Sequence, residues 1–215
     1  MKVFKFQVDE KHAREHNEFL TNSRYFRASG ILLGVLTAVV GVFVYLGPGG
    51  RAVWALILML VLIALGGAFA AAGVTAGRKT GSAQDMYDRY PLIPAVVAEN
   101  DGRHLGLLAL VNTNVNPDVP PRYAWTYTQV KRIPNLDPAK VGNQLPAVAV
   151  FGGRTTRDKD HWQSVDVMPI AWGTPDEDLI TMARKAIPQD QWAKLERGRK
   201  KLDQVKATPD NLLLL

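Results

Sequence analysis

Two long apolar stretches without charged side chains constrain this chain more than any motif does. No Asp, Glu, Lys or Arg lies between Arg27 and Arg51, and none lies between Arg51 and Arg78. A helix needs about 20 apolar residues to cross the hydrocarbon core of a bilayer. We therefore predict a helical hairpin with transmembrane spans at about 28–47 and 52–77, joined by the short turn LGPGGR.

The basic residues around the two spans predict the orientation of the hairpin. Six of them precede the first span, Arg78 and Lys79 follow the second, and the turn carries only Arg51. Because cytoplasmic loops hold the excess of Lys and Arg, we expect both termini to be cytoplasmic. The 27 residues before the first span include four acidic side chains, unlike a cleaved signal peptide, so this span is expected to remain as an anchor.

Small residues recur along both spans and indicate faces where two helix backbones can approach closely. They are Gly30, Gly34 and Gly41 in the first span and Gly66, Gly67 and Gly73 in the second. We expect these faces to pack the hairpin on itself, and the alternative is that one of them docks a partner's membrane helix. No Asp, Glu, Lys, Arg or His lies within either span, so transport by the hairpin alone is not expected.

Residues 78–173 are predicted to form a cytoplasmic β domain, which makes the fold class α+β. Five short segments have the composition of strands: IPAVVAE, HLGLLALVNTNV, RYAWTYTQVKRI, QLPAVAVFGG and HWQSVDVMPIAW. The sequence NDGR between the first two predicts a tight hairpin turn. Because no helical pattern separates the five strands, a small antiparallel barrel or sandwich is expected.

The two ends of the chain are predicted to complete this domain. Within 1–27, the alternating KVFKFQV predicts an edge strand, and a juxtamembrane helix follows it. Two helices are expected over 174–207, the first opened by the capping-box order of Thr174, Pro175 and Glu177. The tail at 208–215 ends in four leucines for which the pattern offers no place in a core.

The motif HAREH resembles an inverted zinc-protease signature, with His12 and His16 on one helical face and Glu15 between them. A catalytic zinc needs a third protein ligand and a sheltered open position. The nearest later Glu, Glu99, follows both spans in a predicted strand. We therefore reject a metal site and expect a polar juxtamembrane helix.

The segment GGRTTR is the candidate anion-binding site. It places Arg154 and Arg157 in a predicted loop beside two glycines, where guanidinium groups and backbone amides could hold a phosphate. A hairpin turn with solvated charges explains the same residues equally well.

The C-terminal run KLERGRKKLDQVK is the candidate basic face. Its cations include Lys194, Arg197, Arg199, Lys200 and Lys201. We expect a solvated helix face first and contact with anionic lipid headgroups second. Nucleic acid is a distant third, because the net charge of +6 is spread over the chain.

Three segments carry a family resemblance: YPLIPAVVAE, LLALVNTNV and MPIAWGTPDED. Together with the two-span hairpin and the N-terminal FKFQVDE, they resemble a family of uncharacterised membrane proteins from corynebacteria and related actinobacteria. The resemblance runs over most of the chain. It implies a multi-pass protein of the bacterial inner membrane, and it brings no activity and no catalytic residue with it.

The leading hypothesis is a non-enzymatic membrane protein whose hairpin anchors a cytoplasmic β-rich domain that binds or scaffolds a partner protein or membrane complex. The rival hypothesis is a membrane-tethered domain that binds or processes an anionic small molecule or lipid headgroup. Expected partners are the lipid bilayer and either another membrane protein or a second copy of this chain. The chain has no cysteine, and no cofactor is expected.

Overall fold

The chain divides into two compact units. The computed structural model describes residues 1–136 and 139–215, with only the backbone described for 76–80. One unit combines Met1–Asn17 with Ala83–Leu215, and the other is Glu18–Ser82. The first 17 residues therefore belong with the β domain, although the sequence pattern had grouped 1–27 as one segment.

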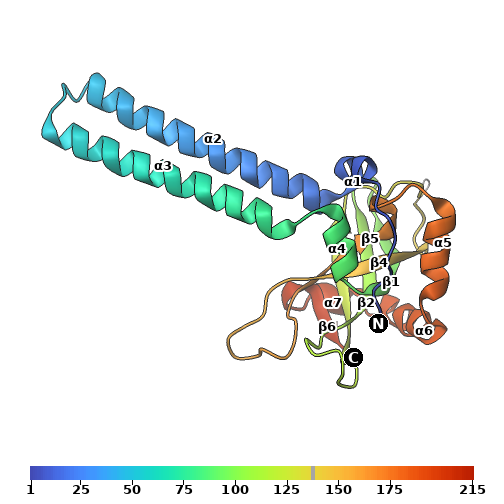
Figure 1. The fold of residues 1–215 in the computed structure, drawn as a ribbon. Coiled ribbons are helices and arrows are strands. Elements are labelled where there is room, and N and C mark those ends of the chain that lie inside the picture. Colours follow the sequence, from blue (N-terminus) through green and yellow to red (C-terminus); the bar gives the residue numbers. More distant parts are fainter. Residues whose placement is uncertain (137–138) are drawn as a thin grey trace. The chain divides into compact units, whose positions relative to one another are not determined.

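The unit Glu18–Ser82 is a hairpin of two long helices, α2 Glu18–Leu46 and α3 Val53–Thr80 (Figure 1). Both helices are long and apolar enough to cross a membrane. Large apolar side chains on both helices point outward, among them Leu36, Val39, Phe43, Ile57, Leu60 and Val61. Such side chains need an apolar surrounding, which agrees with the two predicted spans.

The other unit is built on one antiparallel sheet of six strands. The strands are β1 Leu92–Asn100, β2 Leu105–Asn112, β3 Tyr123–Val130, β4 Gln144–Phe151, β5 Val165–Pro169 and β6 Leu212–Leu214. Their order is β5-β4-β1-β2-β3-β6. The predicted α+β class and the predicted β1–β2 hairpin are confirmed.

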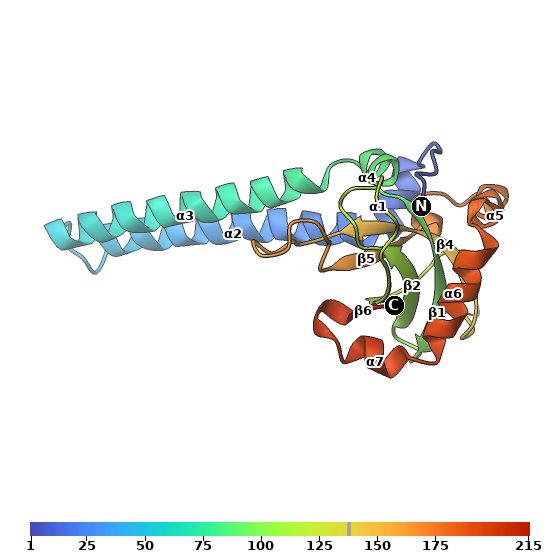
Figure 2. The same ribbon diagram turned by 90° about the horizontal axis from the view of Figure 1, so that it is seen from below.

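The sheet curls into a half-barrel (Figure 2). Threonine side chains join its two sides. On β3, the hydroxyl of Thr126 donates to the carbonyl oxygen of Val165 on β5 at 2.7 Å. Two residues along, Thr128 Oγ1 accepts from the backbone N–H of Val167 at 3.3 Å. Threonine side chains thus supply hydrogen-bond partners for backbone groups at the edge of β5. In a closed barrel, a neighbouring strand would supply these partners.

The leucine tail supplies the sixth strand, which the sequence pattern did not predict. Leu212, Leu213 and Leu214 pair with Thr126, Trp125 and Ala124 of β3. Because an unpaired edge leaves backbone donors and acceptors unsatisfied, the tail covers an edge that a five-strand sheet would expose.

The N-terminal segment is extended but is not the predicted edge strand. Residues 3–8 are described throughout and form no strand, and one backbone hydrogen bond joins Leu92 N to the carbonyl oxygen of Lys2 at 2.8 Å. Both edges of β1 are already paired, with β2 and β4. The amide side chain of Gln84 takes the place of a ladder: it accepts from Val8 N and donates to the carbonyl oxygen of Phe6, both at 2.9 Å.

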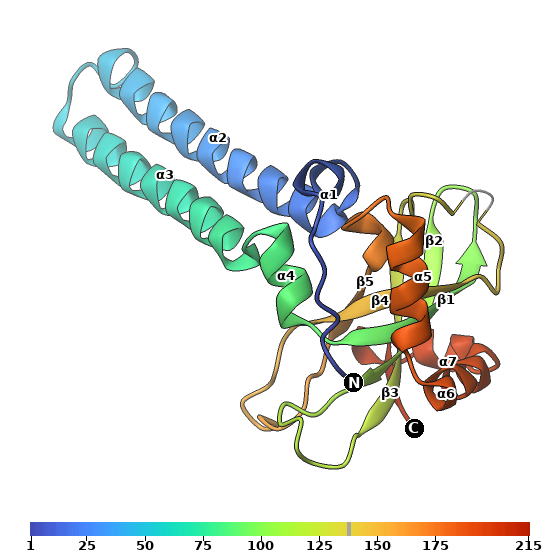
Figure 3. The same cartoon turned by 45° about the vertical axis from the view of Figure 1, so that its right-hand side comes forward.

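Short helices complete this unit, and Figure 3 shows α5 and α6 beside the sheet. They are α1 Glu10–His16, α4 Ala83–Arg89, α5 Glu177–Ala186, α6 Gln189–Arg199 and α7 Leu202–Lys206, with 3-10 turns at Ile170–Trp172 and Pro209–Asn211. The expected second C-terminal helix is therefore split into α6 and α7.

The start of α5 differs from the predicted capping box. Its N-cap is Asp176, whose carboxylate accepts from the backbone N–H groups of Asp178 and Leu179. Thr174 lies further back and accepts from Asp176 N at 3.2 Å. A carboxylate satisfies two N–H groups at the positive end of the helix, so it is a better cap here than the threonine hydroxyl.

Candidate functional site

The long loop between β4 and β5, residues 152–164, is the candidate functional site of the β domain. Its two arms are tied at the base, where Gly152 N donates to the carbonyl oxygen of Ser164 and Gly153 N donates to Ser164 Oγ, both at 2.9 Å. Further out, Thr155 Oγ1 accepts from Gln163 Nε2 at 2.9 Å. The loop therefore holds its own shape.

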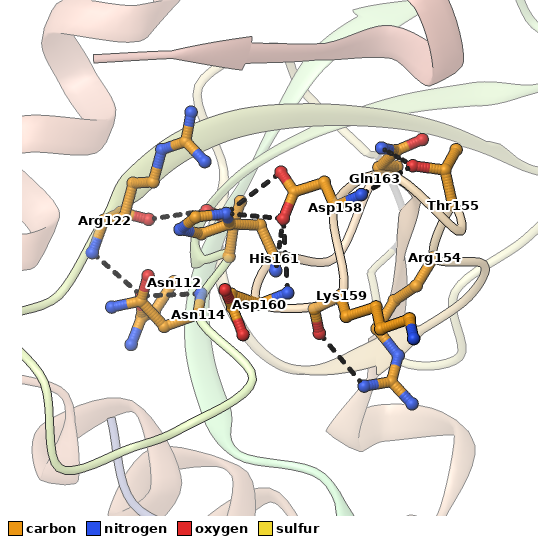
Figure 4. A network of polar contacts seen from close by, with 11 residues as sticks. Asn112, Asn114, Arg122, Arg154, Thr155, Asp158, Lys159, Asp160, His161 and Gln163 are labelled. Carbon is orange, nitrogen blue, oxygen red and sulfur yellow. Dashed lines mark hydrogen bonds and ion pairs between the residues drawn. The ribbon is translucent and has the colours of Figure 1, made fainter.

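A second loop, between β2 and β3, fastens the first (Figure 4). Trp162 N donates to the carbonyl oxygen of Thr113 at 2.7 Å, and Val115 N donates to that of Asp160 at 2.8 Å. Asn112 organises this second loop, because its side-chain oxygen accepts from Arg122 N at 3.0 Å. These backbone hydrogen bonds between the two loops restrict the conformation of each loop.

His161 and Asp158 form a hydrogen-bonded pair of side chains inside the β4–β5 loop. The Nδ1 atom of His161 lies 2.9 Å from Asp158 Oδ1. This hydrogen bond is the largest cause that lowers the pKa of Asp158 below its ordinary value. Asp158 also accepts from the backbone N–H groups of Asp160 and His161, each at 3.2 Å. The pair shapes the loop, since its oxygens are engaged by the loop's own donors.

Four side chains from this region make an arginine–aromatic stack, consisting of Tyr90, Phe151, Arg154 and Trp162. The rings of Phe151 and Trp162 are parallel within 10°, with centroids 5.0 Å apart. The guanidinium carbon of Arg154 lies 4.8 Å from the centroid of the Trp162 ring, and Tyr90 meets Phe151 edge-on at 5.9 Å. All three rings are only partly buried and Arg154 is exposed, so the stack is a preformed surface of rings and one cation.

Arg154 and Arg157 were predicted to bind an anion together with the backbone N–H groups of the adjacent glycines. In the structure, these N–H groups already donate hydrogen bonds within the loop. The N–H groups of Gly152 and Gly153 bond to Ser164, so neither points toward a phosphate. Arg154 donates from Nη1 to the carbonyl oxygen of Lys159 at 3.2 Å. Both arginines are exposed, and anion binding at this loop would depend on their guanidinium groups without the amides that the hypothesis assumed.

Part of the predicted basic face packs on the sheet. Three lysines of the C-terminal helical region each lie over an aromatic ring of β3, and the three rings belong to alternate residues of that strand. The pairs are Lys194 with Tyr123, Lys201 with Trp125 and Lys206 with Tyr127, with ammonium-to-centroid distances of 4.5, 5.5 and 5.3 Å. A cation over a ring face is attracted by the ring quadrupole, so these lysines help to hold α6 and α7 in place.

The remaining residues of that face differ in their contacts. Arg199 forms an ion pair with Glu196 at 2.9 Å, while Arg197 and Lys200 are exposed. Contact of these cations with lipid headgroups stays a prediction.

The HAREH histidines lie side by side on α1, with ring centroids 4.4 Å apart. The Nε2 atom of His12 is 2.9 Å from the carbonyl oxygen of Ala171, to which it must donate. Burial is the largest cause that lowers the pKa of His16 below its ordinary value, and Glu15 is exposed. Over residues 1–136 and 139–215, no three His, Cys, Asp or Glu side chains gather as metal ligands would.

In the hairpin, the structure brings five of the six predicted glycines to the contact between α2 and α3. A Cβ atom added to Gly34 would lie 2.5 Å from the carbonyl oxygen of Gly66, and one added to Gly30 would lie 2.9 Å from Gly73 Cα. A Cβ atom added to Gly41 would lie 3.1 Å from the Cβ atom of Leu62. Gly67 has open space instead.

Comparison with protein-family models gives one match for this chain. It is a family described as protein of unknown function (DUF3239), and the match covers residues 78–203, more than half of the chain. The chain belongs to this family. The matched segment begins where the second apolar stretch ends and includes strands β1 to β5, so the DUF3239 region contains most of the β domain.

A solved structure supports this relationship and the fold. It is described as a "putative membrane protein" from Corynebacterium diphtheriae, and it is 45% identical to this DUF3239 protein, with a TM-score of 0.55. The match covers 58% of this chain and 99% of the other. Among curated proteins, none matches. The resemblance to uncharacterised membrane proteins of corynebacteria is therefore confirmed.

Sequence reasoning missed the arginine–aromatic stack, although the Arg154 cation had been noted. Phe151 and Trp162 are 11 positions apart and Tyr90 precedes the sheet, so no local period connects them. A weak signal was present: 152–164 is a long segment between two strands, and such loops are often functional in compact domains.

Proposed function

We propose that this DUF3239 protein is a non-enzymatic anchor protein of a bacterial cell membrane whose cytoplasmic β domain binds a protein partner through the arginine–aromatic stack. The observation that carries the proposal is the stack itself. Trp, Tyr and Arg are the side chains most enriched among residues that dominate binding energy between proteins. Here the loop network orders Trp162 and Arg154 beforehand, so binding costs little further side-chain entropy.

The hairpin serves as the anchor in this proposal. Its close glycine contacts are used between α2 and α3, and its large apolar side chains point outward, where lipid can surround them. The excess of basic residues before the first span and after the second supports a cytoplasmic location for both termini. The β domain would then lie at the cytoplasmic surface of the membrane.

Purification from native membranes tests the proposal. The full-length tagged protein is extracted in mild detergent, and co-eluting proteins are quantified by mass spectrometry for the wild type, Trp162→Ala and Arg157→Ala. Arg157 is the matched control, because it is an exposed arginine of the same loop outside the stack. We expect a near-stoichiometric companion with the wild type and the control, and roughly tenfold less with Trp162→Ala.

Two results would contradict the proposal. One is a companion that Trp162→Ala retains in full, which would place the contact elsewhere. The other is a wild-type protein that repeatedly elutes alone. Melting curves of each variant separate a lost contact from a misfolded domain.

A further inference from the structure

The β domain contains an apolar cavity of about 420 Å³, distinct from the arginine–aromatic stack. The N-terminal segment forms one wall of this cavity, and the connection between α5 and α6 forms the opposite wall. The lining residues are Met1, Lys2, Val3, Phe4, Leu92, Ala186, Ile187, Pro188 and Gln191. Its volume falls within the range of about 300–1,000 Å³ that small-molecule sites occupy.

Figure 3 shows the extended course of the N-terminal segment, and hydrogen bonds hold this segment in place at three points. Leu92 N donates to the carbonyl oxygen of Lys2 at 2.8 Å, and Asp9 N donates to the carbonyl oxygen of Gly173 at 2.9 Å. Between them, Gln84 bonds to the backbone on both of its amide atoms. The cavity is therefore bounded by a fastened strap rather than by a loose end of the chain.

Gln191 contributes a polar side chain to the cavity. The residue is only 6% exposed and lines the cavity from the first turn of α6. Within the described residues, no hydrogen bond joins its side-chain amide to another protein group, and no buried side-chain nitrogen or oxygen lacks a partner, so the amide reaches the open space of the cavity. A ligand in the cavity can therefore bond to this amide without breaking a hydrogen bond inside the protein.

Charge around the rim completes the description of the ligand. Lys2 lines the opening, and Lys185 is an exposed cation next to the lining residue Ala186. Apolar walls, one amide and a cationic rim match a chain of methylene groups, a carbonyl group and a phosphate, in that order. Asp190, which adjoins Gln191 in the sequence, forms an ion pair with Lys194 at 3.0 Å.

The attachment of the domain says which molecule of this chemistry is always within reach. The cavity residue Leu92 follows the hairpin unit by ten residues, and Phe4 precedes that unit by fourteen. An extended chain spans at most about 3.6 Å per residue, so these two covalent connections, roughly 36 Å and 50 Å at full extension, give the domain a high local concentration of the lipid around the hairpin. Membrane phospholipid is the amphiphile at that surface.

We propose that this cavity binds one acyl chain of a membrane phospholipid, with the Gln191 amide donating to the ester carbonyl and Lys2 facing the phosphate. The acyl chain fills the space between the N-terminal segment and the α5–α6 connection. Binding of one lipid would link the N-terminal strap to the C-terminal helices and hold the domain against the bilayer.

Photo-crosslinking tests the assignment on the full-length protein. The protein is reconstituted in vesicles of phosphatidylcholine and phosphatidylglycerol that contain a trace of phospholipid with a diazirine at the end of one acyl chain. After irradiation, digestion and mass spectrometry locate the labelled peptides. We expect label in the peptide 186–194 as well as in the spans, which label in every sample and report reconstitution.

Two variants fill the cavity from opposite walls, so the test does not depend on one of them folding. Ala186→Trp and Val3→Trp should each reduce the label at the cavity roughly tenfold relative to the spans. Ala193→Trp is the matched control, because this exposed alanine of α6 does not line the cavity. Label that both filling variants retain, or no label at the cavity in the wild type, would overturn the proposal.

A third variant tests the role of the amide. The wild type should label more strongly with an ester phospholipid than with the matching ether phospholipid, and Gln191→Leu should remove this preference. An equal response of the wild type to both lipids would refute the carbonyl contact. Labelling by a photoactivatable free fatty acid with none by phospholipid would overturn the assignment to membrane lipid.

Discussion

The indole ring of Trp125 lies against Gly198 so closely that a Cβ atom on that glycine would come within 2.5 Å of the ring carbon Cδ1. The same ring donates from Nε1 to the carbonyl oxygen of Lys194 at 3.1 Å. One aromatic side chain of β3 thus sets both the distance and the register of α6 on the sheet. The contact explains why a glycine stands within α6 at a position where alanine has the higher helix propensity.

Gly198→Ala is expected to destabilise the β domain. At an open helix position this change would stabilise by up to about 1 kcal/mol. Here the methyl group has no room, so the free energy of unfolding should fall by roughly 1–3 kcal/mol. Urea unfolding of the full-length protein in detergent micelles, followed by near-UV circular dichroism, measures it. Gly153→Ala, which has open space, should change stability by less than about 0.5 kcal/mol, and equal effects would refute the steric argument.

Gly34→Leu is expected to separate the two helices of the hairpin. The Cβ position of Gly34 lies 2.5 Å from the carbonyl oxygen of Gly66, whereas Gly67 has open space. Because the chain has no cysteine, spin labels can be attached at Leu36→Cys and Leu60→Cys alone. Their distance should lengthen and its distribution broaden in Gly34→Leu and stay unchanged in Gly67→Leu. Matching distributions for the two variants would contradict the close packing.

The contact of Glu99 with Lys206 is expected to make stability depend on pH. Lys206 donates to the carboxylate at 2.9 Å, and this bond is the largest cause that lowers the pKa of Glu99 below its ordinary value, followed by the Tyr127 hydroxyl. A carboxylate whose pKa is lower in the folded state than in the unfolded state stabilises the fold at pH values above its unfolded-state pKa. This stabilisation is lost as the pH falls through the folded-state pKa.

Glu99→Gln should therefore lower the melting temperature at pH 7 by roughly 1–3 °C, a small change because the pair is partly exposed. The difference between wild type and variant should shrink as the pH falls below about 4. Paired melting curves from pH 3 to 8 measure it. A difference that stays constant over this range would exclude the carboxylate as its source.

Leu213→Asp is expected to detach the last strand. Leu213 pairs with Trp125 in the β3–β6 ladder and is half-buried, so a charge at this position would oppose the pairing. We expect a loss of about 1–3 kcal/mol and faster hydrogen exchange at the β3 amides. The neighbour Leu215 lies beyond the strand and is 56% exposed, so Leu215→Asp is the matched control. Equal exchange in both variants would argue against a structural role for the tail.

Single cysteines test the proposed orientation. Pro48 lies in the turn of the hairpin and Ala207 on the β domain, and both are exposed. A membrane-impermeant maleimide added to intact spheroplasts should label Pro48→Cys, while Ala207→Cys should react only after the membrane is opened. The reverse pattern would place the domain on the outer side of the membrane.

The secondary structure was largely readable from local pattern. Uncharged runs of membrane length predict the two spans, because the hydrocarbon core tolerates few other sequences. The β1–β2 hairpin was equally accessible, since NDGR supplies Gly102 at a positive φ of 83° where the turn requires it. Glycine spacing also indicated which faces of α2 and α3 could approach. These features depend on residues close together in the chain.

Tertiary structure decided the features that depend on distant residues. Trp125 and Leu213 are 88 positions apart, and only the curl of the sheet shows that the leucine tail pairs with β3. The N-terminal segment alternates as a strand does, yet β1 has no free edge to receive it, so it packs through Gln84. The arginine–aromatic stack and the cavity at Gln191 likewise join residues from several elements. Local pattern determines what a segment can form, while competition for edges and packing surfaces determines where that segment is used.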